Sequence, residues 1–214
     1  MKKILLSLTI LLIPILMFGC QKTITLEDSM SEITKIYFTA ENQDVTANIS
    51  VGEREEDYII DGKHTKNCDF SLIALKFDNL LAENVIEVEL KINNVSSTIQ
   101  LELNPANHFY MADLGYALKE TDQIQLNYNE NHLTFSQVEF GIDYNQALKI
   151  AKEELGDKMD KYYNDKNFAG EGYLKVLTQQ DEEELFWVFT VVGNDDSKNN
   201  VVLSVEDGKV LVSD

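Results

Sequence analysis

Apolar and polar residues alternate along the chain between residues 35 and 140, which is the pattern of β-strands with one buried and one solvent-facing side. The apolar side of the clearest run consists of Ile86, Val88, Leu90 and Ile92. A second run continues the pattern with Ile99, Leu101 and Leu103. Asn93 and Asn94 separate the two runs, and Asn accepts the positive φ angles of a tight turn. The sequence therefore predicts a β-hairpin over residues 85–103.

Shorter runs of the same kind predict further strands on either side of this hairpin. They lie at residues 33–40, 45–51, near 58–60, 69–77, 108–112, 124–128 and 133–135. The last two are expected to pair as a second hairpin across Asn129-Glu130-Asn131. Because alternating strands bury only one face, two antiparallel sheets are expected to pack against each other. We therefore expect a mainly β protein with an immunoglobulin-like β-sandwich over residues 35–140. The Cys…Trp…Cys pattern of immunoglobulin cores is missing, so this likeness concerns architecture alone.

Helical spacing replaces the alternation after Gly141. Asp143 is a favourable N-cap, Gln146 completes a capping box, and Gly156 is a natural stop. The apolar residues at helical spacing are Tyr144, Ala147, Leu148, Ala151 and Leu155. Strands are expected next at 171–179, 184–192 and 199–205, with a last short strand after the turn at 206–209. Residues 141–214 are therefore expected to form a small α+β domain.

Three segments of this second domain carry a resemblance to a known family. They are the capped, Ala-containing helix start at 142–151, the strand Leu185-Phe186-Trp187-Val188-Phe189 and the final turn Gly208-Lys209-Val210-Leu211. In this order they resemble the PepSY domain, a helix-and-sheet module of secreted and membrane-attached bacterial proteins. The resemblance implies a domain without catalysis that inhibits or modulates proteases at the cell surface.

The first twenty residues combine a positive start, an apolar run and a cysteine. Lys2 and Lys3 precede an apolar run over 4–18, and Gly19-Cys20 follows. A run of about fifteen residues is short for a membrane span, which takes roughly 20, and fits a signal peptide. The ending Leu16-Met17-Phe18-Gly19-Cys20 resembles the lipobox of bacterial lipoproteins. The resemblance implies that residues 1–19 are cleaved off and that Cys20 becomes a diacylated N-terminus.

Two acyl chains hold a protein stably to a bilayer. The expected location is therefore the extracytoplasmic face of the cell membrane, with Cys20 as the lipidation site. Residues 20–34 are expected to form the lipidated cysteine and a polar tether, followed by the β-sandwich domain at 35–140. The alternatives are an ordinary secretory signal with a coincidental cysteine and an uncleaved anchor.

The chain is strongly acidic, with 18 basic and 37 acidic residues among 214 and a net charge of −19. Such a charge argues against a nucleic-acid partner, because phosphate binding requires a basic surface. Removal of residues 1–19 leaves 16 basic and 37 acidic residues, a net charge of −21. An anionic leaflet repels such a body, so the lipid itself has to attach the protein. With Cys20 lipidated, Cys68 has no partner for an intramolecular disulfide.

Several clusters could carry chemistry, and each also has a plainer structural interpretation. The segment 61–69 contains His64 and Cys68, which can bind a transition metal, but its spacing favours an exposed loop. The segments 194–197 and 181–184 offer oxygen ligands for a cation, but they fit a hairpin tip and a charged loop. Aromatic residues near the helix exit fit either core or a binding surface; they are Tyr162, Tyr163, Phe168 and Tyr173.

The familiar enzyme motifs are missing from the sequence, including His-Glu-x-x-His, Gly-x-Ser-x-Gly, Cys-x-x-Cys and a phosphate-binding glycine loop. We therefore assign no catalytic, cofactor-binding or metal-binding residue. The leading hypothesis is a non-enzymatic lipoprotein that binds or regulates an envelope or secreted protein, such as a protease. The alternative is a surface module that binds a small ligand, a metal ion or a wall polymer.

Overall fold

The computed structural model describes residues 23–56, 59–178 and 184–214, which form a mainly β protein with one α-helix. The signal segment 1–19, the lipidation site Cys20 and most of the acidic run 181–184 lie outside the described residues. Within the described ranges, no helix has the length and apolar character needed to cross a membrane.

The elements follow one another along the chain as two groups. The strands before the helix are β1 (Met30–Glu41), β2 (Val45–Glu55), β3 (Asn67–Phe77), β4 (Val85–Ile92), β5 (Val95–Asn104), β6 (Phe109–Asp113), β7 (Ile124–Tyr128), β8 (Asn131–Thr134) and β9 (Ser136–Gln137). The later strands are β10 (Tyr163–Asn164), β11 (Asn167–Phe168), β12 (Gly170–Thr178), β13 (Leu185–Gly193), β14 (Lys198–Ser204) and β15 (Val210–Ser213). The helix α2 spans Tyr144–Leu155, and the 3-10 helices are η2 (Glu27–Ser29) and η3 (Gly156–Tyr162).

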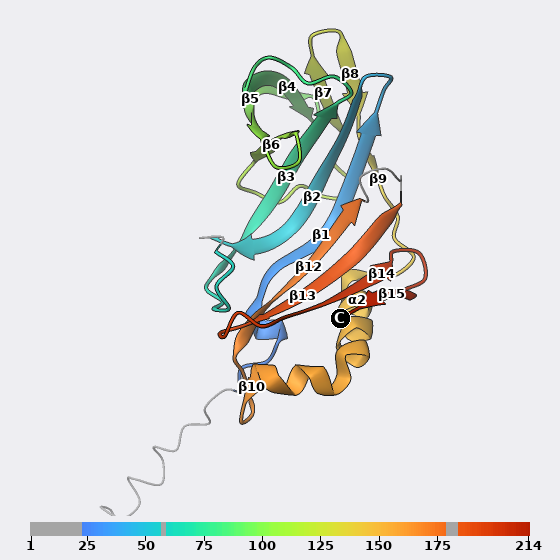
Figure 1. Ribbon diagram of the computed structural model, residues 1–214. Coiled ribbons are helices and arrows are strands. Elements are labelled where there is room, and N and C mark those ends of the chain that lie inside the picture. The colour runs from blue at the N-terminus through green and yellow to red at the C-terminus, as the bar shows by residue number, and fades with distance from the viewer. Residues whose placement is uncertain (1–22, 57–58, 179–183) are drawn as a thin grey trace, which may run out of the picture.

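Thirteen of the described strands join in one mixed sheet that runs through the whole molecule (Figure 1). Its order is β15-β14-β13-β12-β1-β2-β3-β6-β5-β4-β7-β8, with β9 also paired to β1. The pairing of β1 with β12 is parallel, whereas the other pairings in this sheet are antiparallel. β10 and β11 form a separate small hairpin.

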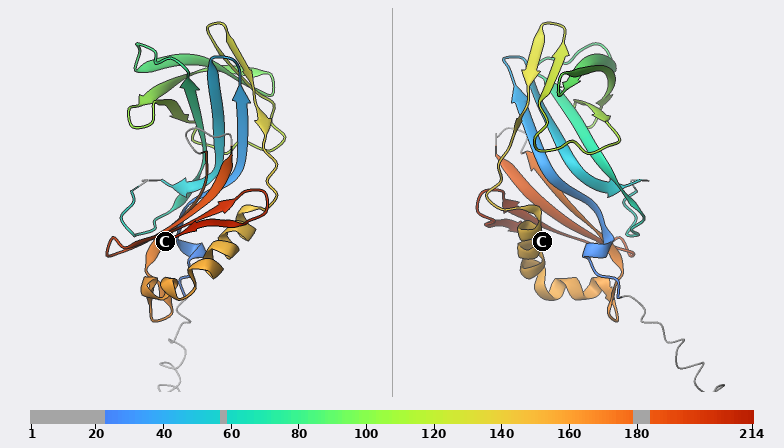
Figure 2. Two further views of the ribbon diagram at one scale, coloured as in Figure 1. Left: turned by 45° about the vertical axis from the view of Figure 1, so that its right-hand side comes forward. Right: turned by 180° about the vertical axis from the view of Figure 1, so that it is seen from behind.

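The part of the sheet from β2 to β8 curls back on itself (Figure 2). The curl brings β9 alongside β1, where Gln137 and Ser136 pair with Phe38 and Thr39. Its inner face encloses a first core, whose largest fully buried side chains are Tyr110, Phe38, Ile49, Ile73, Leu75 and Leu90. The expected mainly β, sandwich-like character is thus confirmed. The expectation of two separate sheets in this part is wrong, because hydrogen bonds join all of its strands into one sheet that curls around the core. The immunoglobulin-like assignment stays a prediction.

The two hairpins expected in this part are confirmed. β4 and β5 pair along their length across Asn93 and Asn94, whose φ angles are 49° and 68°. β7 and β8 pair across Asn129, whose φ is 51°. Asn tolerates this left-handed conformation better than most residues, which is why it marks both turns.

A second core lies between α2 and the sheet formed by β12, β13 and β14 (Figure 2). Asp143 caps α2 through a capping box with Gln146, as expected, and Gly156 follows the helix with a φ of 47°. Trp187 is completely buried and packs against the Phe140 ring with centroids 5.0 Å apart. The helix and four strands of residues 141–214 therefore occur where the sequence predicts them, while the PepSY-like assignment stays a prediction.

β1 belongs to both cores, because it presents one face to each. Tyr37 packs in the core under α2, and its neighbour Phe38 packs in the core of the curled sheet. One edge of β1 pairs with β2 along its length. The other edge is divided between β12, which pairs from Met30 to Ile33, and β9. A single strand thus joins the two halves of the molecule.

The segment expected to be a polar tether is folded from Leu26 onward. Leu26 and Met30 are buried, and β1 begins at Met30. A Cβ placed on Gly172 would lie 2.5 Å from the Met30 sulfur and 2.9 Å from Leu26 Cδ1. These two apolar side chains therefore fill the space that glycine leaves on β12, and the free energy of burying them holds the segment in place. Residues 26–34 of the expected tether therefore belong to the folded body.

The strand expected near 58–60 is absent at residues 59–60, and residues 57–58 lie outside the described part. Ile59 and Ile60 are exposed and belong to an irregular segment that leads to β3. Their apolar character alone produced the expectation of a strand.

We predict that Gly52→Ala destabilises the protein strongly, because an added Cβ would lie 1.9 Å from the Ile33 carbonyl oxygen. Overpacking of this kind costs about 1–3 kcal/mol, and a clash with backbone belongs at the upper end. Gly115→Ala is the matched control: space around Gly115 is open and its φ of 74° is the only obstacle, costing roughly 1–2 kcal/mol. Urea denaturation measures both values. Equal losses would contradict a close approach of β1 and β2 at Gly52.

Candidate functional site

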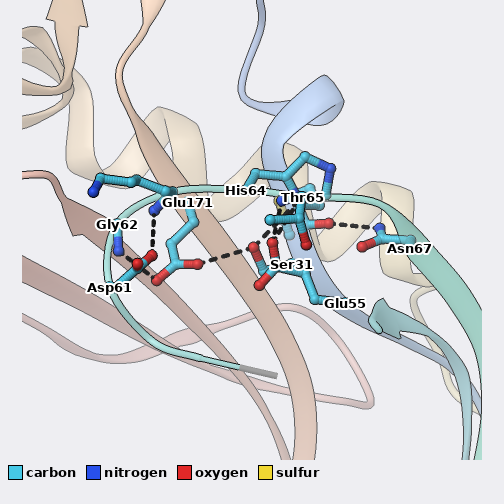
Figure 3. Close-up of polar contacts among 10 residues, drawn as sticks. Ser31, Glu55, Asp61, Gly62, His64, Thr65, Asn67 and Glu171 are labelled. Carbon is cyan, nitrogen blue, oxygen red and sulfur yellow. Dashed lines mark hydrogen bonds and ion pairs between the residues drawn. The ribbon is translucent and has the colours of Figure 1, made fainter. Parts of the chain in front are cut away.

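Several polar groups are buried together near the start of β1, where β1, β2, β12 and the segment 59–66 meet (Figure 3). We call this set the polar junction; it consists of Ser31, Glu55, Gly62, His64, Thr65 and Glu171. Glu171 and Ser31 are 0% exposed, and Glu55 is 1% exposed. Burial of two carboxylates lowers stability unless hydrogen bonds satisfy them. The role of the junction therefore follows from the hydrogen-bond partners of Glu55 and Glu171.

Glu171 links three elements through its two carboxylate oxygens. Its Oε1 accepts a hydrogen bond from the Gly62 amide at 2.8 Å, and its Oε2 accepts one from the Ser31 hydroxyl at 3.0 Å. Gly62 has a φ of 78°, and a Cβ there would lie 2.5 Å from the Gly193 carbonyl oxygen. Only glycine fits this approach, so the segment 59–66 is held tightly against β12 and the end of β13.

His64 and Glu55 complete the junction on the side of β2. The His64 Nδ1 atom lies 3.3 Å from the Ser31 hydroxyl oxygen and 3.4 Å from Glu55 Oε1. The Thr65 amide donates a hydrogen bond to the same Glu55 oxygen. Next to the junction, the Asn67 side-chain amide donates to the Met30 carbonyl at 2.7 Å. These bonds tie the segment 59–66 to both β1 and β2.

The junction contains a serine, a histidine and carboxylates, but their arrangement differs from that of a nucleophilic triad. In a triad the serine contacts one imidazole nitrogen and the acid contacts the other. Here Ser31 and Glu55 both face Nδ1 of His64. The Ser31 hydroxyl also donates to Glu171 and has no exposed surface. The geometry is that of a structural tie between strands.

A shallow cleft of about 340 Å³ opens beside the junction. Its lining residues are Ile24, Asp28, Ser29, Gly62, Lys63, His64, Phe168, Ala169, Gly170 and Asn194. His64 is partly exposed and therefore connects the buried network to this surface. The cleft mixes apolar and polar groups, as small-ligand sites do, but it is wide open to solvent.

A second hollow of about 590 Å³ lies at the tips of the β1–β2 and β7–β8 hairpins. It is lined by Asn42, Gln43, Asp44, Asn129, Glu130 and Asn131. The Asn42 side-chain amide donates to Asn131 Oδ1 at 2.9 Å and joins the two tips. The polar lining makes this a solvated surface rather than an apolar binding pocket.

The structure does not bring Cys68 and the three histidines together. Cys68 is exposed on β3, His108 occupies the β5–β6 turn with a φ of 61°, and His132 lies on β8 beside Asn127. Only His64 joins the polar junction. In the described part of the chain, no group of three or more His, Cys, Asp or Glu side chains is arranged to hold a metal ion.

The segment 194–197 forms the turn between β13 and β14. Hydrogen bonds from the Ser197 side chain and backbone lower the pKa of Asp195, and the backbone bond measures 3.1 Å. Of the aromatic cluster near the helix exit, Tyr162, Phe168 and Tyr173 are buried, whereas Tyr163 is 37% exposed. The aromatic cluster is thus mainly core, with one ring at the surface.

Sequence reasoning missed the buried members of the junction, Ser31, Glu55 and Glu171. Glu171 stands between Gly170 and Gly172 at the start of β12, and glycines flanking a strand residue can indicate a close backbone approach. Ser31 and Glu55 carry no such signal. Ser31 meets Glu171 on a strand 140 residues away, and Glu55 meets the irregular segment 59–66, whose path no periodicity predicts.

The edge strand β15 is a further feature suited to binding a partner. Within the described residues, β15 pairs with β14 on one side and with no strand on the other. Leu211 is 44% exposed and Val212 is 56% exposed. The strand is held firmly, since the Asp214 amide donates to the Asn200 carbonyl at 3.1 Å and the Asn199 side chain donates to the Asp214 carbonyl at 2.6 Å.

No known protein family, curated protein or solved structure matches this chain.

We predict that Glu171→Ala loosens the segment 59–66. The variant leaves the Gly62 amide without its acceptor, and an unsatisfied buried donor costs about 1–3 kcal/mol. Glu171→Gln is the control, because its amide oxygen still accepts from Gly62 and its NH₂ donates to the Ser31 hydroxyl. Limited trypsin digestion should cut after Lys63 faster in the Ala variant than in the Gln variant. Cleavage of the Ala variant at the wild-type rate would contradict the role of Glu171.

Proposed function

We propose that this chain is an extracytoplasmic lipoprotein, anchored through acyl groups on Cys20, that binds or regulates another envelope or secreted protein without catalysing a reaction. The observation that carries the binding role is the open, firmly held edge of β15 with Leu211 and Val212 exposed. A strand edge without a hydrogen-bonded neighbour can pair with another chain. Proteins usually prevent this by shortening the edge strand, by placing charged residues on it or by covering it. An edge left with apolar side chains is suited to adding a strand from a partner.

The net charge of the chain indicates which charge the binding segment of the partner carries. The mature chain has a net charge of −21, so an extended segment with basic residues approaches β15 favourably. The resemblance of residues 141–214 to the PepSY domain favours a secreted or envelope protease as the source of that segment. In this proposal an immunoglobulin-like sandwich at 35–140 supports the PepSY-like domain at 141–214.

The second candidate function is binding of a small ligand, and the cleft beside His64 favours it. A ligand there would contact His64 directly and reach the polar junction through it. A wall polymer or a metal ion is supported less well, because the polymer is itself anionic and the described residues offer no cluster of three ligands. A thermal-shift screen with small polar ligands, repeated on His64→Ala, tests this candidate.

We expect Cys20→Ser to abolish lipid attachment. The wild-type chain, labelled with a radioactive fatty acid in a bacterial host, should carry label and float with membranes. The Cys20→Ser chain should carry none, because the thiol is the acylated group. Cys68→Ser is the control and should label normally. Equal labelling of the Cys20→Ser chain would contradict the lipoprotein proposal.

We expect Val212→Lys to weaken partner binding at least tenfold, because a lysine on an edge strand opposes pairing and repels a basic segment. The mature chain is immobilised, envelope and secreted proteins are applied, and the affinity of each retained protein is then measured with purified components. Val95→Lys is the matched control, since Val95 is 72% exposed in the β4–β5 hairpin, away from β15.

Hydrogen exchange of the purified complex locates the contact. Slower exchange at residues 210–213 on binding would support addition of a strand to β15. A partner that binds Val212→Lys as tightly as the wild type, and leaves these amides unprotected, would contradict the edge as the binding site.

A further inference from the structure

The chain enters the folded body at one fixed point beside the β10–β11 hairpin (Figure 1). The Ile24 amide donates to Asn167 Oδ1 at 3.0 Å, and the Phe168 amide donates to the Ile24 carbonyl at 2.9 Å. Two residues later Leu26 is buried under β12. These contacts fix the N-terminal segment to the hairpin from Ile24 onward.

The lipidation site lies close in sequence to this entry point. Only four residue steps separate Cys20 from Ile24. A fully extended chain covers at most about 3.6 Å per residue, so the two positions lie within about 14 Å of each other. With acyl chains on Cys20 inside a bilayer, the entry point is held at the headgroup region.

The surface around the entry point carries exposed side chains that can contact a bilayer. Ile24 is 46% exposed and Tyr163 is 37% exposed. Tyr163 has an apolar ring with a polar tip, a combination that favours the membrane interface, and its ring contacts that of Phe168 with centroids 5.4 Å apart.

The η3 and hairpin part of this surface carries balanced charges. Residues 156–168, which comprise η3 and the hairpin, contain three lysines and three aspartates. The segment is therefore neutral, whereas the mature chain as a whole carries a net charge of −21. The exposed lysines are Lys158, Lys161 and Lys166. An anionic leaflet repels the body as a whole but does not repel this segment.

We propose that the surface formed by Ile24, the exposed side of η3 and the β10–β11 hairpin rests on the lipid headgroups and orients the protein on the membrane. This inference rests on the acylation of Cys20 in the proposed function. Contact with the bilayer at this surface directs the β7–β8 hairpin, at the opposite end of the molecule, away from the membrane (Figure 1).

A tryptophan placed at the β10–β11 hairpin tests the contact. The Tyr163→Trp chain is produced in a bacterial host, acylation of Cys20 is verified by mass spectrometry, and the protein is reconstituted into vesicles of phosphatidylethanolamine and phosphatidylglycerol. Brominated lipids quench tryptophan at the membrane interface. We expect at least a twofold loss of fluorescence from the introduced tryptophan, measured after subtraction of the chain that carries only the buried Trp187.

Glu130→Trp, in the β7–β8 turn, is the matched control and should not be quenched. Insertion of twelve Gly and Ser residues between Lys22 and Thr23 should reduce quenching in the Tyr163→Trp chain, because the longer tether releases the body. An unquenched Tyr163→Trp chain with acylated Cys20, or equal quenching of the two tryptophan variants, would overturn this inference alone. A chain without acyl groups on Cys20 would overturn the lipoprotein proposal and this inference with it.

Discussion

The arrangement of this molecule depends on the way one strand, β1, divides its hydrogen bonds and its side chains. Its first residues pair in parallel with β12, its later residues pair with β9, and β2 occupies its other edge from Glu32 to Glu41. Because neighbouring strand residues face opposite sides, Tyr37 and Phe38 enter different cores. A substitution in β1 therefore acts on both halves, and neither half can shift without breaking pairs made by the other.

The polar junction lies at the start of β1, where β1 pairs with β12, and its hydrogen bonds hold the two strands together there. Buried carboxylates lower stability when they lack partners, and here Glu171 and Glu55 accept hydrogen bonds from backbone amides of the segment 59–66. The hydrogen bonds of Glu171 would be lost if β12 slipped along β1, because Ser31 and Gly62 would no longer face its carboxylate. The junction therefore contributes to the register of the parallel pair as well as to its stability. His64 is the member that connects this interior to the cleft.

The elements that sequence analysis predicted correctly are those determined by neighbouring residues. The hairpin turns at Asn93–Asn94 and at Asn129, and the capping box of Asp143 and Gln146, depend on local backbone geometry. The pairing of β1 with β12, the burial of Leu26 and Met30 against β12, and the bonds of Glu171 depend on contacts across more than a hundred residues. Periodicity reports which side of a strand is buried but carries no information on which strand lies beside it.

The parallel pairing of β1 with β12 also determines when folding of the chain can be completed. Met30 aligns with Gly172, so the first strand of the sheet receives one of its neighbours only after most of the chain has been made. Contacts between residues so distant in sequence make folding slow, because a long loop has to close before they form. The core under α2 cannot be finished from the C-terminal half of the polypeptide alone, since it also requires Leu26 and Met30. A chain of this design completes its fold only once its first strand and its last third are present in the same compartment.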